Sequence, residues 1–234
     1  SAVRPEPTSE ELLTVIFRYI ARIPTERDVD RLLVLFADLG RELVTASSCT
    51  LWLVDREKQV LWSRVSHELG RVTIPLASGI AGLVARTGEA VLLNDPYHDP
   101  RFDPEVDRRY SFRTRNLIAL PVVSAAGVVM GVFQAVNKRT PEDAFTPKDL
   151  EHLHLASTYT AMELEAALVH EELEKSGREI ILTLAETCEL RSRETGMHVN
   201  RVAEYTGMLG ERLGLPADEL ERLKVAAPLH DIGK

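Results

Sequence analysis

The sequence predicts an α+β fold, in which an antiparallel sheet of about six strands is flanked by helices. A long helix and a partial all-α domain are expected to follow the sheet. Two observations support this fold class. Short apolar, β-branched runs bounded by turn residues recur between residues 49 and 136. On both sides of them, longer stretches carry apolar residues at helical steps of three and four.

The composition is that of a globular protein and excludes several classes. The chain has 234 residues, enough for one or two domains, with 44% apolar and 27% charged residues. A net charge of −8 argues against a general nucleic-acid binder. No apolar run approaches the ~20 residues of a membrane span. Cys49 and Cys188 make no metal-binding spacing, so we expect reduced thiols in a cytoplasmic protein.

Two helices are expected before the sheet. Ser9 can cap the first helix, and acidic residues follow it in the first turn. Pro24-Thr25 should end this N-terminal helix, which we assign to residues 1–25. A second helix is expected from about Glu26 to Thr45 and opens a domain that extends to residue 146. The apolar faces of both helices are expected to pack in a core, and part of each face could meet a partner subunit.

The strands are interrupted by one helix that could bind a phosphate. Ser78 is a candidate N-cap for a helix that begins with Gly79-Ile80-Ala81-Gly82 and ends near Gly88. Free N–H groups at a helix N-terminus converge on anions, and the helix dipole favours negative charge there. The expected strands are Cys49–Val54, Val60–Val65, Arg71–Pro75, Val91–Asn94, Asn116–Val123 and Val128–Val136.

Residues 94–114 form a polar, proline-containing segment, which we call the lid. Long ordered loops beside a sheet usually carry function, so we expect the lid to close over a pocket. The alternative is a surface excursion without a ligand. Side chains that could bond to the polar edge of a ligand or stack on a ring are Asn94, Asp95, Asp103, Thr114, Phe102 and Tyr110. Lys138 and Asp149 could form an ion pair that clamps the lid, or a surface pair worth under ~1 kcal/mol.

A long amphipathic helix is expected over residues 147–176. Thr146-Pro147 fits a helix start, and acidic residues cover the outer face. Such a helix leaving a sensor domain is typical of a parallel dimer stalk, although it could simply pack on its own sheet. Ser176-Gly177 should weaken it, with a new helix beginning at Arg178.

Several motifs resemble those of GAF domains, over roughly Ala21 to Leu164. The similarity is closest to GAF domains of mammalian cyclic nucleotide phosphodiesterases and cyanobacterial adenylyl cyclases. It implies that the backbone amides of Ile80 and Ala81 hold a cyclic phosphate, and that the candidate side chains of the lid read the edge of a purine base or stack on its ring. Leu150 stands where that subgroup has Glu, which favours an alternative, a ligand-free dimerisation scaffold. The residues that carry the resemblance are Asp99-Pro100-Arg101-Phe102, Phe112-Arg113-Thr114-Arg115-Asn116, Asn137-Lys138, Phe145 and Asp149.

A second set of residues has the spacing of metal ligands. Glu194 and His198 are four residues apart, so a helix would place them on one face, although Gly196 lies between them. His230 and Asp231 supply an adjacent imidazole and carboxylate. Such groups suit hydrolytic metal chemistry, in which the metal activates a water molecule.

Residues 177–234 resemble the beginning of an HD-GYP domain, a metal-dependent cyclic di-GMP phosphodiesterase. The resemblance implies that Glu194, His198, His230 and Asp231 are metal ligands, for Fe or Mn in the full-length enzyme, and that Lys234 contacts the substrate phosphate. The family's remaining ligands and Gly-Tyr-Pro segment are not in this sequence. We therefore expect no bound metal and no activity in this fragment.

Together these features predict a GAF sensor that regulates a cyclic di-GMP phosphodiesterase in bacterial signalling. Its ligand would be a cyclic nucleotide, cAMP or cGMP. The N-terminal helix and the long helix over residues 147–176, which would transmit the signal, would join two copies in a homodimer. Nucleic-acid and membrane partners are not expected.

Overall fold

The computed structural model describes residues 3–64, 71–109, 112–189 and 198–230. The chain divides into two compact units, Ser1–Leu168 and Val169–Lys234. The first unit contains the sheet and the lid, and the second is helical. None of the described helices is long and apolar enough to cross a membrane.

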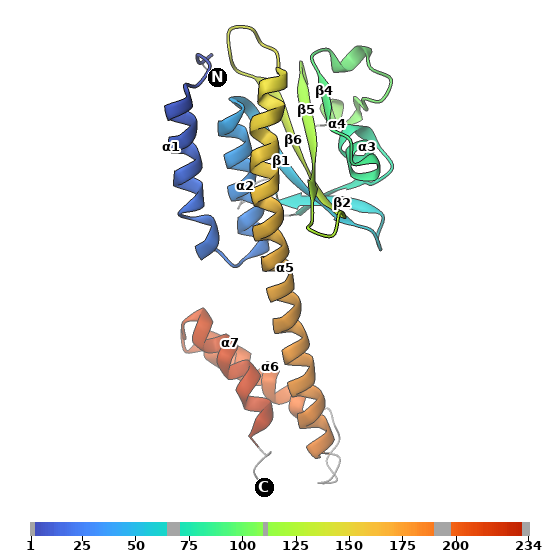
Figure 1. Ribbon diagram of the computed structural model, residues 1–234. Helices are drawn as coiled ribbons and strands as arrows, with labels where there is room; N and C mark the ends of the chain where they lie inside the picture. Colours follow the sequence, from blue (N-terminus) through green and yellow to red (C-terminus); the bar gives the residue numbers. More distant parts are fainter. Residues whose placement is uncertain (1–2, 65–70, 110–111, 190–197, 231–234) are drawn as a thin grey trace. The chain divides into compact units, whose positions relative to one another are not determined.

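The first unit is built on a six-stranded sheet in which every neighbouring pair is antiparallel (Figure 1). Its strand order, β3-β2-β1-β6-β5-β4, places β1 and β6 at the centre. This sheet confirms the predicted fold class. The strands are β1 (Ala46–Asp55), β2 (Val60–Arg64), β3 (Arg71–Pro75), β4 (Val91–Leu93), β5 (Leu117–Val123) and β6 (Val129–Lys138).

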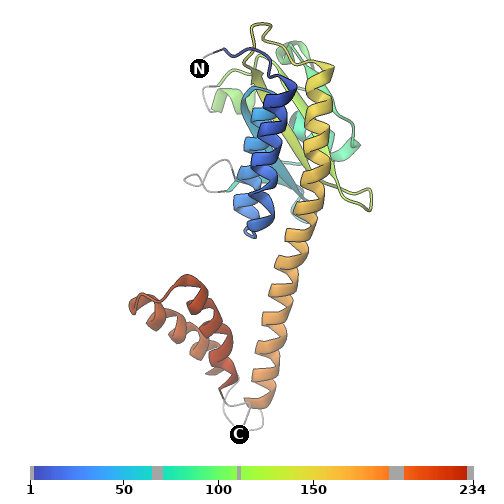
Figure 2. The same ribbon diagram turned by 60° about the vertical axis from the view of Figure 1, so that its left-hand side comes forward.

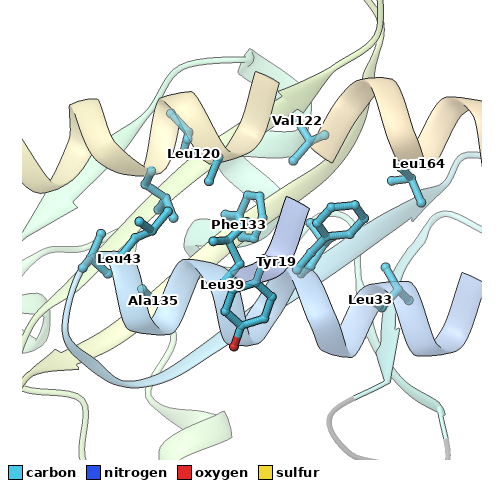
Figure 3. Close-up of a cluster of buried hydrophobic side chains, with 14 of the residues drawn as sticks. Tyr19, Leu33, Leu39, Leu43, Leu120, Val122, Phe133, Ala135 and Leu164 are labelled. Carbon is cyan, nitrogen blue, oxygen red and sulfur yellow. The ribbon is translucent and has the colours of Figure 1, made fainter. Parts of the chain in front are cut away.

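The two faces of the sheet are covered by different helices. Alternate residues of a strand point to opposite faces, so β1 and β6 each contribute to two cores. One core joins the sheet to α1 (Ser9–Ile20), α2 (Val29–Leu43) and the first part of α5 (Pro147–Glu189). Figure 3 shows Phe133 of β6 among the side chains of this core. The other core joins the opposite face to α3 (Gly79–Thr87).

The first helices begin at different residues from those expected. Thr8, and not Ser9, caps α1, because it forms a reciprocal capping box with Glu11. After a short 3-10 helix, η1 (Ile23–Thr25), Asp28 caps α2 by accepting the N–H of Arg31. α1 then packs along α2 (Figure 2).

Helix α3 lies close against the chain that precedes it. A side chain at Gly82 would meet the carbonyl oxygen of Leu76 at 2.5 Å, so this position needs glycine. The helix ends at Gly88, whose φ of 72° is left-handed, as the sequence predicts. The lid that follows contains two short helices, η2 (Pro96–His98) and α4 (Glu105–Arg109).

Helix α5 starts as expected and continues much farther. Thr146 and Asp149 cap its first turn reciprocally, through two hydrogen bonds between side chain and backbone. The helix runs for 43 residues from Pro147 to Glu189, so the predicted interruption at Ser176-Gly177 is wrong. One glycine costs only about 1 kcal/mol in a helix interior, which a long helix tolerates.

The second unit pairs short helices with the end of α5. It contains α6 (His198–Arg212), α7 (Ala217–Ala226) and η3 (Ala227–Leu229). Leu220 of α7 is buried against Gly210 of α6. Arg178 of α5 lies 3.3 Å from Glu221, an exposed ion pair within this unit.

Candidate functional site

A buried carboxylate organises the lid. Asp107 of α4 is only 5% exposed. Its Oδ2 accepts the Tyr97 hydroxyl and the Thr114 backbone N–H, both at 2.7 Å, and its Oδ1 accepts the Thr114 hydroxyl at 2.9 Å. These bonds join three separate parts of the lid. The sequence does not single out Asp107, because one aspartate in a segment rich in charged residues gives no local signal of burial.

Tyr97 and its neighbours form an aromatic group in the lid. The rings of Tyr97 and Phe102 are 5.3 Å apart and tilted by 54°, and the Arg113 guanidinium lies 5.5 Å from the Tyr97 ring. The hydrogen bond to Asp107 raises the pKa of the Tyr97 hydroxyl above its ordinary value. Phe102 is also half-buried against the core beneath α3.

The lid also holds two exposed local ion pairs. Arg101 binds the Asp99 carboxylate with two nitrogens, at 2.8 and 2.7 Å. These bonds lower the pKa of Asp99 to about 2. His98 lies 2.7 Å from Asp95, and that hydrogen bond raises the pKa of the imidazole. Both pairs favour the turns at the beginning of the lid.

Asn137 fastens the end of the lid to strand β6. Its Oδ1 accepts the Arg115 N–H at 2.7 Å, and its Nδ2 donates to the Arg113 carbonyl at 2.9 Å. A second bond joins the same two segments with the side chain on the other one, because Oδ1 of Asn116 accepts the backbone N–H of Lys138 in β6 at 2.7 Å. The backbone of Asn137 is left-handed, with φ of 58°, a conformation that asparagine tolerates better than most residues.

The predicted ion pair between Lys138 and Asp149 is present and buried. Nζ of Lys138 lies 2.5 Å from Oδ1 of Asp149, and the two side chains are 0% and 4% exposed. The alternative of a surface pair is therefore wrong. Oδ2 of Asp149 also accepts the N–H and hydroxyl of Thr146, at 2.8 and 3.0 Å. We call Asn116, Asn137, Lys138 and Asp149 the latch.

The residues predicted to read a base make contacts within the protein. Both polar atoms of the Asn94 side chain bind the Phe145 backbone, at 3.0 and 2.8 Å, which gives Asn94 a structural role that the sequence analysis missed. Asp103 accepts the N–H of Glu105 at 3.0 Å. The ligand roles of these residues, and of Asp95, Phe102 and Thr114, stay predictions. Tyr110 lies outside the described residues.

Helix α3 presents its first turn without a side-chain cap. Ser78 stands at the N-cap as predicted, but its hydroxyl makes no capping bond and lies 3.4 Å from the Pro75 carbonyl. Gly79 has φ of 67°, and Ile80 and Ala81 are buried. The binding of an anion by the backbone N–H groups of this turn stays a prediction.

Gln134 is a polar residue on the sheet face beneath α3. Its Oε1 accepts the indole N–H of Trp52 at 2.9 Å, and its side chain is half-buried. Trp52 belongs to the same core as Ile80 of α3. The signal in the sequence was a single polar residue between Val132 and Val136 on one face of an apolar strand.

Most of the predicted metal site lies outside the described side chains. Glu194, Asp231 and Lys234 are not among the described residues, and only the backbone of His198, at the start of α6, is described. Nδ1 of His230 lies 2.9 Å from the Ala227 carbonyl. No group of three metal-ligating side chains occurs in the described part of the chain. The metal ligands therefore stay predictions.

Comparisons with protein families identify two segments. The family model described as GAF domain matches residues 26–165, and the model described as HD domain matches residues 195–234. A probable 3',5'-cyclic phosphodiesterase from Caenorhabditis elegans is 26% identical over 63% of this chain and 22% of its own length. A dual 3',5'-cyclic-AMP and -GMP phosphodiesterase from Takifugu rubripes is 33% identical over 48% of this chain and 14% of its own length. This chain thus spans less than a quarter of either relative.

Solved structures share the fold of the first unit. The GAF domain of a phosphoenolpyruvate-protein phosphotransferase from Coxiella burnetii has a TM-score of 0.58 and 15% identity, covering 71% of this chain and 99% of that one. Free methionine-R-sulfoxide reductase from Neisseria meningitidis, with its substrate, has a TM-score of 0.57 and 20% identity, covering 72% and 98%. These similarities show the fold and carry no information on the ligand.

Proposed function

Because this chain belongs to the GAF domain family, we propose that its first unit is a regulatory module that binds a cyclic mononucleotide. The ligand would lie between the sheet and the lid, on the face that α3 covers. The relatives that are cyclic nucleotide phosphodiesterases support this ligand class. The single observation that carries the proposal is the uncapped first turn of α3, placed in one core with the half-buried Phe102.

The cyclic phosphate would bind the first turn of α3. The N–H groups of Ile80 and Ala81 would donate to its oxygens, and the helix dipole would favour its charge. Such a contact needs no charged side chain, which agrees with the apolar surroundings of both residues. It would give affinity for any cyclic mononucleotide without selecting the base.

The base would be selected by side chains of the floor and the lid. Gln134 uses its Oε1 for Trp52, so its Nε2 would donate to a carbonyl on the purine. Guanine carries such a carbonyl and adenine does not, so this group favours cGMP. Phe102 would pack against the ring, as its half-buried position on the same core allows.

The output of the module would be the HD domain that follows it. We propose a metal-dependent cyclic di-GMP phosphodiesterase of the HD-GYP type, with Fe or Mn held by Glu194, His198, His230 and Asp231. Lys234 would contact the substrate phosphate. Ligand binding can change this activity only if the ligand prefers one of two arrangements of the protein. A cytoplasmic location agrees with a free thiol at Cys49.

Helix α5 would join two copies of the chain. Several large apolar side chains on it are exposed, and many are spaced seven residues apart, the repeat of a two-stranded coiled coil. A dimer would cover them. Sedimentation of wild type and of Met162→Glu tests this, because the charged side chain should convert a dimer to monomer. The exposed residues are Leu155, Met162, Val169, Leu173, Ile180 and Leu184.

Titration calorimetry with cAMP, cGMP and cyclic di-GMP tests the ligand. The proposal predicts saturable binding of a cyclic mononucleotide with a Kd of roughly micromolar size, tighter for cGMP. Gln134→Leu should reduce the preference for cGMP while binding of cAMP persists.

If none of the three nucleotides binds to a chain that melts cooperatively, the sensor proposal fails. The alternative, a GAF domain that serves as a dimerisation scaffold, would then hold. Leu150 favours this alternative, since it packs against the first core.

A further inference from the structure

The segment Arg4–Thr8, which we call the strap, lies across the latch. The Arg4 N–H donates to the Arg139 carbonyl at 2.7 Å, directly beyond strand β6. Glu6 then places Oε1 3.0 Å from Nζ of Lys138. Thr8 begins helix α1 through its capping box. The strap is therefore fixed at both ends and meets the latch in its middle.

The ammonium group of Lys138 forms ion pairs with two carboxylates, and these differ in their exposure to solvent. Asp149 is buried and also holds Thr146, whereas the Glu6 side chain is 53% exposed. A buried ammonium group is costly unless its charge is paired and its hydrogens are bonded, so both carboxylates stabilise it. Because the Glu6 side chain already reaches water, Glu6 can leave while the buried Asp149 stays paired with Lys138.

The strap does not pack tightly on the surface beneath it. A cavity of about 260 Å³ lies at this place. Glu6 and Pro7 line it from the strap, and Asp149 and His152 line it from α5. The ion pair to Lys138 and the backbone bond at Arg4 hold the strap beside this cavity.

From Lys138 the connection continues to the end of the lid. The Lys138 N–H is bonded to Asn116, and its neighbour Asn137 holds the Arg115 N–H and the Arg113 carbonyl. Loss of one carboxylate from Lys138 would loosen the backbone at that residue. The same backbone positions Asn137, so the end of the lid would loosen with it.

We propose that the strap regulates the latch: while Glu6 is bound to Lys138 the bonds of the latch to Arg113 and Arg115 are held, and when Glu6 leaves Lys138 these bonds break more often. This inference goes beyond the proposed ligand. It assigns to the N-terminal segment a control over the latch through the ion pair between the half-exposed Glu6 and the buried Lys138.

Hydrogen exchange of the ligand-free chain tests this proposal. The amides of Arg115 and Lys138 report on the latch directly, because each is bonded to an asparagine side chain across it. Glu6→Gln should raise their exchange rates about five-fold or more. Glu10→Gln is the matched control, since Glu10 is an exposed glutamate in the adjacent first turn of α1. It should leave both rates unchanged.

Two results would overturn the proposal. One is unchanged exchange at Arg115 and Lys138 in Glu6→Gln. The other is an equal rise in Glu10→Gln, which would assign the effect to helix α1 and not to the ion pair. In a Lys138→Met background, Glu6→Gln should add nothing. The measurement needs no nucleotide, so failure of all three nucleotides to bind would refute the proposed function and leave this test intact.

Discussion

Oδ1 of Asn137 accepts the backbone N–H of Arg115 at 2.7 Å, and so ties strand β6 to the end of the lid. The same residue has a left-handed backbone with φ of 58°. Asn137 therefore has two separable roles, one in its side chain and one in its backbone conformation. A pair of substitutions can measure each of them.

Asn137→Ala should destabilise the first unit more than Asn137→Gly, by about 1 kcal/mol. Both variants lose the bonds to Arg113 and Arg115, but only alanine also has the strain of positive φ. Urea unfolding measures the difference. Equal stability of the two variants would show that the backbone conformation at this position is not strained.

Lys138→Met should cost about 3–5 kcal/mol of unfolding free energy, because it leaves the Asp149 carboxylate buried without its partner. Lys58→Gln is the control. Its ion pair with Asp55 has a similar length, 2.9 Å, but the Lys58 side chain is exposed. The control should unfold at the wild-type urea concentration. Equal effects of the two substitutions would contradict the role of burial.

The sequence predicts the parts of this fold that depend on local patterns. Runs of β-branched residues predict the six strands, and Thr146-Pro147 predicts the start of α5. The residues of the latch were recognised through their resemblance to a family motif. The local pattern of apolar and charged residues does not predict that Lys138 pairs with Asp149.

Contacts between distant segments could not be read from the sequence. Asp107 meets Tyr97 and Thr114 only because the lid folds back on itself. Gln134 becomes a floor residue only when α3 covers its face of the sheet. The predicted break at Gly177 failed for another reason, since a local penalty of about 1 kcal/mol does not end a helix of 43 residues.

Asp107→Asn should loosen the lid. An amide in place of the carboxylate cannot accept all three bonds from Tyr97 and Thr114, and the bonds that remain lose the charge that strengthens them, at a cost of about 1–3 kcal/mol. The pKa of Tyr97 should fall towards its ordinary value, since the bond to Asp107 raises it. Ultraviolet titration of the tyrosines and thermal unfolding measure the two effects. An unchanged Tyr97 titration would contradict the contact.

His98 should titrate above its ordinary pKa, because the bond to Asp95 favours the charged imidazole. A folded-state pKa above the unfolded value stabilises the fold below the unfolded pKa, and this contribution is lost as pH rises through the folded pKa. The start of the lid should therefore be better ordered below about pH 6.5 than at a pH above the raised pKa of His98. NMR titration of the imidazole measures the pKa. Asp95→Asn should return it to the ordinary value, and a pKa unaffected by that substitution would refute the pair.

An NMR titration of the labelled chain with cyclic GMP tests the proposed nucleotide site. We expect the backbone amides of Ile80 and Ala81 and the side-chain amide of Gln134 to shift together with one saturation curve. They would do so because the phosphate and the base of one nucleotide contact them. Shifts confined to other residues, or no saturable shift at these three, would contradict a cyclic nucleotide site between α3 and the sheet.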